Sequence, residues 1–169
     1  LEHRGATGAD PLVGDGAGML TQIPHEMYRE EMEKLSCFLP DLGGYGVGMF
    51  FFPKEVNYHT LIKSIIVKYG EEQGIKLLGW RDIPVNNDCL SKDEEIREAE
   101  PIHVQGFFKK PEGMSEDDFE RNLYVLRKKT TNKIYKELGS EELYYAVSLS
   151  SRTVVYKGMF LADQLAKYY

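Results

Sequence analysis

Twice in this sequence, two strand-like segments follow each other with no helical segment between them. The first pair is IKLLGWRDIPV (residues 75–85) and IHVQGFF (residues 102–108), and the second is LYYAVSLSS (residues 143–151) and TVVYKG (residues 153–158). The second pair flanks Arg152 and alternates apolar with polar residues, which predicts a hairpin or a bent pair of strands. Such runs of two strands favour an α+β fold with a mostly antiparallel sheet over a doubly wound parallel sheet.

Helical periodicity marks the segments between the strands. Apolar residues at helical spacing after Asn57 predict a helix that Asn57 caps and that Gly70 or Gly74 ends. Further strands are expected over residues 17–23 and 45–53, and further helices over residues 25–35 and 161–169.

A long amphipathic helix is expected in the second half of the chain. Ser115 and Asp118 resemble a capping box, and one apolar face continues from there until Gly139. The acidic run KDEEIREAE (residues 92–100) is interpreted as a solvated face or loop.

Composition limits the class of protein. A chain of 169 residues, 42% hydrophobic and 28% charged, predicts one folded domain. The net charge of −6 disfavours nucleic-acid binding. No run approaches the ~18 apolar residues of a membrane span, and no signal peptide is recognisable. A cytoplasmic protein is therefore expected, although the chain begins with Leu1 instead of a methionine.

The cysteines and histidines predict neither disulfides nor a metal site. Two cysteines are too few for a disulfide framework, and the four histidines are not at ligand spacing. These residues are Cys37, Cys89, His3, His25, His59 and His103.

The opening stretch LEHRGATGADPLVGDGAGML (residues 1–20) is rich in glycine. Either the backbone takes positive φ in turns there, or something approaches the backbone closely. The stretch lacks the ending of a phosphate-binding P-loop, and spacing alone favours a surface loop with turns. Arg4 within it is most simply a surface arginine paired with Asp10 or Asp15.

The stretch SLSSRTVVYKG (residues 148–158) places polar residues among apolar strand residues. Ser150 or Ser151 beside Arg152 and Lys157 could be an activated nucleophile, but adjacent serines at a strand turn are more simply turn residues. The glycines of GGYGVG (residues 43–48) do not have dinucleotide-binding spacing.

In combination, HRGATGAD, GDGAG, LGWRD and SSRTVVYKGM resemble the class II amidotransferase domain of the large subunit of glutamate synthase. The resemblance runs over residues 1–169, which we interpret as the central portion of a single domain. It implies an N-terminal-nucleophile hydrolase fold, a four-layer αββα sandwich, here incomplete at both ends. Another class II enzyme such as an asparagine synthetase shares HRG but should not show LGWRD together with SSRTVVYKGM.

The resemblance also implies a reaction. In that family an N-terminal cysteine attacks the side-chain amide of L-glutamine, ammonia leaves, and the thioester is hydrolysed. The ammonia converts 2-oxoglutarate to glutamate at a flavin (FMN), with an iron–sulfur cluster, on other domains. That cysteine precedes HRG by about one strand and one helix, and Cys37 and Cys89 do not match it, so we expect no catalytic residue and no activity from this chain alone.

The residues that match the family are expected to contribute to the pocket. Arg4 resembles the arginine that lines the nucleophile's pocket, and Gly5, Asp10, Asp15 and Gly16 are expected to shape the same wall. The signature residues Ser151, Arg152 and Lys157 carry no assigned role.

Two further expectations concern partners. The remaining domains or subunits of a glutamate synthase are the expected partners, and a sheet edge left uncovered predicts self-association. The alternative is a non-catalytic binding or regulatory module that keeps the amidotransferase scaffold, so whether the chain is itself an enzyme stays open.

Overall fold

A computed structural model describes residues 10–140 and 143–169, and its elements follow the predicted order. Every expected helix and strand is present, and the acidic run contains one additional short helix, α3. The elements are β1 (Ala17–Gln22), α1 (His25–Lys34), β2 (Tyr45–Phe52), α2 (Val56–Glu71), β3 (Lys76–Asp82), the 3-10 turn η2 (Asn87–Cys89), α3 (Glu94–Ala99), β4 (Ile102–Lys109), α4 (Glu116–Leu138), β5 (Tyr145–Ser150), β6 (Thr153–Gly158) and α5 (Leu165–Tyr168).

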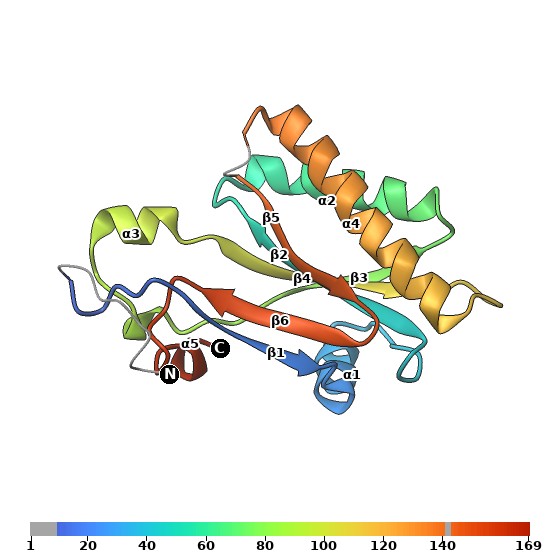
Figure 1. Ribbon diagram of the computed structural model, residues 1–169, viewed down its shortest axis with the longest axis horizontal. Coiled ribbons are helices and arrows are strands. Elements are labelled where there is room, and N and C mark those ends of the chain that lie inside the picture. Colours follow the sequence, from blue (N-terminus) through green and yellow to red (C-terminus); the bar gives the residue numbers. More distant parts are fainter. Residues whose placement is uncertain (1–9, 141–142) are drawn as a thin grey trace.

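The larger sheet has the strand order β3-β4-β2-β5, and all its pairings are antiparallel. Along the chain its elements run β2-α2-β3-β4-α4-β5, which is the β-α-β-β-α-β arrangement of a split βαβ unit. Helices α2 and α4 both lie on one face of this sheet (Figure 1). The predicted α+β class with antiparallel sheets is confirmed.

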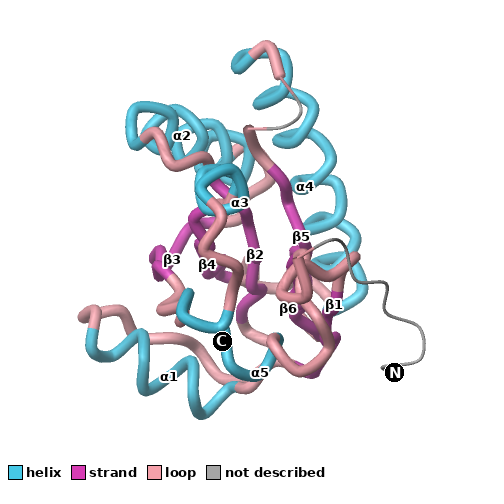
Figure 2. The backbone as a smooth tube through the Cα atoms, turned by 90° about the vertical axis from the view of Figure 1, so that its left-hand side faces the viewer, coloured by secondary structure: helices cyan, strands magenta, loops and turns pink. Residues whose placement is uncertain are grey.

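A second sheet consists only of β1 and β6, which pair antiparallel over six residue pairs from Ala17↔Gly158 to Gln22↔Thr153. The whole β-α-β-β-α-β unit is therefore inserted between the two strands of this ribbon (Figure 2). The alternative of a β5–β6 hairpin is wrong, because the chain bends at residues 151–152 and passes from one sheet to the other. β5 and β6 are instead the bent pair of strands, which was the other arrangement predicted from the sequence.

Strand β2 separates two regions of the core because its side chains alternate between the faces of the sheet. Phe50 and Phe52 pack under α2 and α4, whereas Met49 packs with Val154 of the ribbon. The described residues thus stack a helix pair, a sheet and a two-stranded ribbon. The four-layer αββα sandwich is a finer arrangement that these layers do not test.

Glycine in the GGYGVG stretch serves close packing. A Cβ on Gly46 would lie 2.5 Å from Cδ1 of Leu123, a residue of α4. The glycine therefore lets the long helix approach the sheet.

The capping prediction for α4 is confirmed and that for α2 is wrong. Ser115 Oγ accepts a hydrogen bond from the Asp118 backbone N–H, and Gly139 ends the helix with φ +68°. Helix α2 instead begins at Val56 after Glu55, so Asn57 lies inside the helix. Within the described residues, no helix is both long and apolar enough to cross a membrane.

A buried polar cluster joins the larger sheet to α1 and to the ribbon. The Gln105 side-chain amide donates to the hydroxyls of Tyr28 (2.8 Å) and Tyr156 (3.1 Å). Its carbonyl oxygen accepts from Arg81 (3.1 Å), and Arg81 also donates to Glu31 (3.0 Å). Gln105 and Tyr28 are fully buried, so these hydrogen bonds satisfy groups that water cannot reach.

We expect Gln105→Leu to lower the free energy of unfolding by about 2–3 kcal/mol, because buried donors and acceptors lose their partner. Urea unfolding at equilibrium measures the change. Gln73→Leu is the matched control, since the Gln73 side-chain amide donates to the Tyr69 carbonyl within its own helical region. Equal losses for both variants would contradict a special role for Gln105.

Candidate functional site

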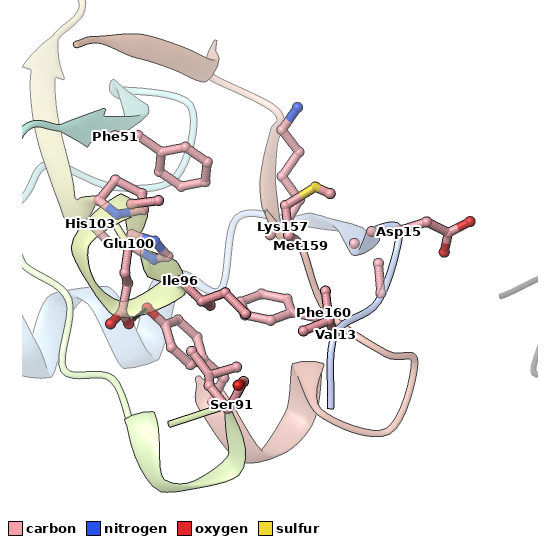
Figure 3. A pocket seen from close by; sticks show the side chains of 18 of the residues that line it. Val13, Asp15, Phe51, Ser91, Ile96, Glu100, His103, Lys157, Met159 and Phe160 are labelled. Atoms are coloured by element: carbon pink, nitrogen blue, oxygen red, sulfur yellow. Dashed lines mark hydrogen bonds between the residues drawn. The ribbon is translucent and has the colours of Figure 1, made fainter. Parts of the chain in front are cut away.

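A cavity of about 780 Å³ lies where the ribbon, the loop before β1 and the segment between η2 and β4 meet (Figure 3). Most of the side chains around it are apolar. The lining residues are Leu12, Val13, Asp15, Gly16, Ala17, Gly18, Phe51, Leu90, Ser91, Ile96, Ala99, Glu100, Pro101, His103, Tyr145, Lys157, Gly158, Met159, Phe160 and Tyr168.

Three of the site and signature residues named from the family resemblance line this cavity together. They are Asp15 and Gly16, from the loop before β1, and Lys157, from β6. Asp10 adjoins them, because its carboxylate accepts hydrogen bonds from Ser91 Oγ (2.5 Å) and from the Leu12 backbone N–H (2.8 Å). These two hydrogen bonds hold the pKa of Asp10 below its usual value.

Two other predicted wall residues, Arg4 and Gly5, lie outside the described residues. The predicted pairing of Arg4 with Asp10 or Asp15 lies outside the described residues as well.

Both reasons considered for the glycines of the opening loop apply to it. Gly16 has φ +125°, a backbone conformation that favours glycine. A Cβ on Gly14 would lie 2.4 Å from the carbonyl oxygen of Phe160. What approaches Gly14 closely is therefore the protein's own backbone, just after β6.

Lys157 is the cation of this cavity. Its Nζ donates to the Tyr145 hydroxyl (3.0 Å) and lies 4.3 Å from the centroid of the same ring. Within the described residues, no carboxylate forms a salt bridge with Lys157. The ammonium group is thus positioned by a neutral partner and keeps its charge uncompensated by an ion pair.

An aromatic cluster builds the opposite side of the cavity. The His103 ring stacks on Phe51 with centroids 4.6 Å apart. The Tyr169 hydroxyl donates to the Lys157 carbonyl (3.0 Å) and lies 2.9 Å from His103 Nδ1. Since the Tyr169 proton is used for that carbonyl, Nδ1 is the donor to Tyr169 and Nε2 is the unprotonated nitrogen. Burial lowers the pKa of His103 to about 4, so the ring is neutral at pH 7.

Glu100 is a carboxylate whose oxygens are already used. It accepts from the Tyr168 hydroxyl (2.6 Å) and from the Asn87 amide (3.0 Å), and Arg97 lies 3.8 Å away. These partners tie the segment after α3 to α5 and η2. We therefore interpret Glu100 as a structural residue of the cavity wall.

The other two signature residues lie at the far end of β6. Ser151 donates from both its backbone N–H (2.8 Å) and its Oγ (2.7 Å) to Glu120 of α4, and Arg152 pairs with Asp117. Arg152 is five strand residues from Lys157, roughly 17 Å along β6. The signature residues therefore lie in two places, with Ser151 and Arg152 at the contact with α4 and Lys157 in the cavity. This geometry favours the interpretation of the serines as turn residues over that of a nucleophile.

Ser148 and Ser150 also have structural partners. Ser150 Oγ accepts from the backbone N–H of Thr153 (3.2 Å), and Ser148 Oγ accepts from that of Val155 (3.3 Å). The alternating serines of β5 therefore accept hydrogen bonds from backbone N–H groups of β6 that point away from β1.

Neither cysteine is placed for catalysis. Cys37 donates to the Leu78 carbonyl (3.3 Å), and burial raises the pKa of its thiol. Cys89 donates to the Asn86 carbonyl (3.2 Å), and neither residue lines the cavity. Over residues 10–140 and 143–169, no three His, Cys, Asp or Glu side chains gather as metal ligands would. The cavity can bind an apolar group beside a cation, but its described side chains form no nucleophile–base pair.

The aromatic side of the cavity was not predicted from the sequence. His103 was considered only as a metal ligand, and Phe51, Tyr145, Tyr168 and Tyr169 only as strand or helix residues. The one available signal was His103 itself, a titratable residue within the largely apolar strand IHVQGFF.

Comparison with known proteins identifies a family over the full chain. Residues 1–169 match the model of the class II glutamine amidotransferases. The chain is 36% identical over 169 residues to "Ferredoxin-dependent glutamate synthase 2, chloroplastic" of Arabidopsis thaliana. It is 38% identical over 170 residues to "Glutamate synthase [NADPH] large chain" of Bacillus subtilis (strain 168).

Each of these alignments includes all of this chain. The chain spans about a tenth of the length of these relatives, 10% and 11% respectively. What is similar is therefore one segment of much longer enzymes.

We expect the stability of the chain to fall as the pH falls from 7 to 4.5, in part because of His103. The unfolded chain takes up a proton near pH 6.5, whereas folded His103 does so only near pH 4. This difference in pKa lowers the free energy of unfolding by about 2–3 kcal/mol at pH 4.5 relative to pH 7. His103→Phe should remove this part of the pH dependence, as measured by urea unfolding at both pH values. Identical pH dependence in both proteins would contradict the assignment.

Proposed function

Because the chain belongs to the class II glutamine amidotransferases, we propose that it is the central portion of the amidotransferase domain of a glutamate synthase. The observation that carries this proposal is the alignment of all 169 residues with glutamate synthases described as ferredoxin-dependent and as NADPH enzymes. A cytoplasmic location stays a prediction, and plant relatives are described as chloroplastic.

The proposed substrate of the complete domain is L-glutamine, whose side-chain amide would be released as ammonia for the conversion of 2-oxoglutarate to glutamate. Within this chain, Arg4, Gly5, Asp10, Asp15 and Gly16 would form one wall of the pocket. The described part of this wall is supported by its backbone contact with the end of β6 and by the Asp10–Ser91 hydrogen bond. The chain would thus supply the pocket wall, not the nucleophile.

We also propose that the β1–β6 ribbon belongs to the sheets of a four-layer αββα sandwich. Two of the family motifs support this placement, because GDGAG leads into β1 and SSRTVVYKGM contains β6. The β-α-β-β-α-β unit would then be an insertion beside the sandwich, held to the ribbon through Gln105 and Tyr156.

The redox groups of the proposed enzyme would lie elsewhere. An iron–sulfur cluster usually takes four cysteine thiolates, and this chain has two cysteines. The cluster would therefore be held by other domains or subunits, which are the proposed partners and would also hold the FMN.

A segment exchange tests the proposal. In this experiment, these 169 residues replace the matching segment of the Bacillus subtilis glutamate synthase large chain. We expect the exchange protein to keep glutamine-dependent glutamate formation. Arg4→Ala in this exchange protein should lower that activity at least tenfold and leave ammonia-dependent formation unchanged, because added ammonia bypasses the amidotransferase step. The isolated 169-residue chain should release no ammonia from glutamine.

The controls separate the proposal from a non-catalytic module. Arg121→Ala is a matched arginine variant, on the exposed face of α4, and should change neither activity. An exchange protein that uses ammonia but not glutamine would contradict the proposal and favour the module. Ammonia release by the isolated chain above a heat-denatured control would contradict the expectation that the nucleophile lies elsewhere.

A further inference from the structure

A second hollow in the surface lies where α4 packs along β5 (Figure 1). This α4–β5 groove has a volume of about 550 Å³ and shares no lining residue with the cavity described above. One wall consists of residues of α4 between Glu120 and Arg127, and the other consists of residues 148–150 of β5 with Thr153 of β6.

The groove lies away from both gaps in the described residues. Its β5 residues are the last three of that strand, whereas residues 141–142 come before the first, Tyr145. Thr153 pairs with Gln22, the last residue of β1, whereas residues 1–9 come before Ala17, the first. The side chains that line the groove are therefore well separated along their strands from the residues that are not described.

Arg127 is a cation of this groove without an anionic partner. Its side chain is partly buried, and its guanidinium group carries five N–H donors. Within the described residues, Arg127 forms no salt bridge, and its guanidinium contacts the ring of Tyr124, whose centroid lies 5.7 Å from Cζ. Donors removed from water are normally paired with an acceptor, so the guanidinium group has capacity for a ligand.

The other two charged side chains of the groove are already engaged. Arg121 forms a salt bridge with Asp118 (2.5 Å). Glu120 Oε2 accepts hydrogen bonds from the backbone N–H and Oγ of Ser151. The charge that is left to attract a ligand is therefore that of Arg127, and the ligand that complements it is an anion.

Two buried hydroxyl groups add donors on the β5 wall. Ser148 and Ser150 are each 8% exposed. Their oxygens accept from backbone N–H groups of β6, that of Val155 for Ser148 and that of Thr153 for Ser150. A hydroxyl group also carries one proton, and within the described part of the chain neither serine donates it to an acceptor. Both protons are thus available to an oxygen atom of a ligand.

The fold places Arg127 level with Ser148. Helix α4 and strand β5 run in opposite directions, and Glu120 contacts Ser151. From this contact, Arg127 lies ~10 Å along α4, and Ser148 lies ~10 Å back along β5. The unpaired guanidinium group and the available hydroxyl group therefore face the same part of the groove.

We propose that the α4–β5 groove binds a small organic oxyanion, either a carboxylate or a phosphate. The guanidinium group of Arg127 binds the oxyanion through paired N–H groups, and the Ser148 hydroxyl donates to it from the other wall. Tyr124 and Val125, which are 54% and 38% exposed, offer apolar surface to the organic group. This site lies outside the proposed glutamine pocket and does not depend on the enzymatic role of the chain.

An NMR titration of the ¹⁵N-labelled chain at constant ionic strength tests the site. The probes are phenyl phosphate, benzoate and, as the control without an oxyanion, phenol. We expect saturable shifts of the amide signals of residues 148–155 with at least one oxyanion, and the tighter of the two distinguishes phosphate from carboxylate. No saturable shift with either oxyanion, or equal binding of phenol, would overturn the proposal.

A pair of charge variants tests the role of Arg127. Arg127→Gln should raise the Kd of the tighter oxyanion at least tenfold, because it removes charge-assisted hydrogen bonds. Lys129→Gln is the matched control, because it removes the same charge from the same helix outside the groove, and it should change the Kd less than twofold. Equal effects of the two variants would indicate attraction by net charge alone and would refute the site.

A second pair tests the hydroxyl group. Ser148→Ala should raise the Kd at least threefold, whereas Ser148→Thr, which keeps a hydroxyl group, should restore binding. Thermal unfolding of both variants shows that they are folded, since Ser148 also accepts from the Val155 N–H. Unchanged binding in Ser148→Ala, or equally weak binding in both folded variants, would contradict the assignment of Ser148.

Discussion

The antiparallel pairing of β1 with β6 brings two of the family motifs together, GDGAG and the end of SSRTVVYKGM. It sets Asp15 and Gly16, just before β1, beside Lys157, near the end of β6. The pairing is supported from both sides, by the contact of Gly14 with the backbone at Phe160 and by the hydrogen bond between Gln105 and Tyr156. The cavity exists because these contacts hold the two strands in register.

The β-α-β-β-α-β unit between the two strands is the larger part of the structure, yet it contributes only part of the cavity. Phe51 and His103, on the face of its sheet opposite α2 and α4, form the aromatic side. His103 belongs to β4, and the same strand carries Gln105 two residues later, on the same face of the sheet. One strand face therefore both supports the ribbon and closes the cavity beside it.

Local patterns in the sequence predicted the elements well, because a cap or a periodic apolar face depends on residues close together in the chain. Ser115 with Asp118, and the strands on either side of Arg152, are examples. The partition of β5 and β6 between two sheets was not predictable, because it depends on the pairing of β6 with a strand far away in the sequence. The aromatic side of the cavity was missed for the same reason, since His103 meets Tyr169 only in the fold.

The insertion between β1 and β6 has a consequence for the order of folding. Pairing two strands separated by about 130 residues of unfolded chain costs on the order of 4 kcal/mol in loop closure. Once the inserted unit is folded, Val47 of β2 is already paired with Ser150 of β5, so the segments that lead to β1 and β6 start close together and much of that cost has been met. The ribbon is then the last part to form and the first to open, an order that hydrogen exchange at its paired amides would reveal. The integrity of the cavity is thus controlled by a unit that lies mostly outside it.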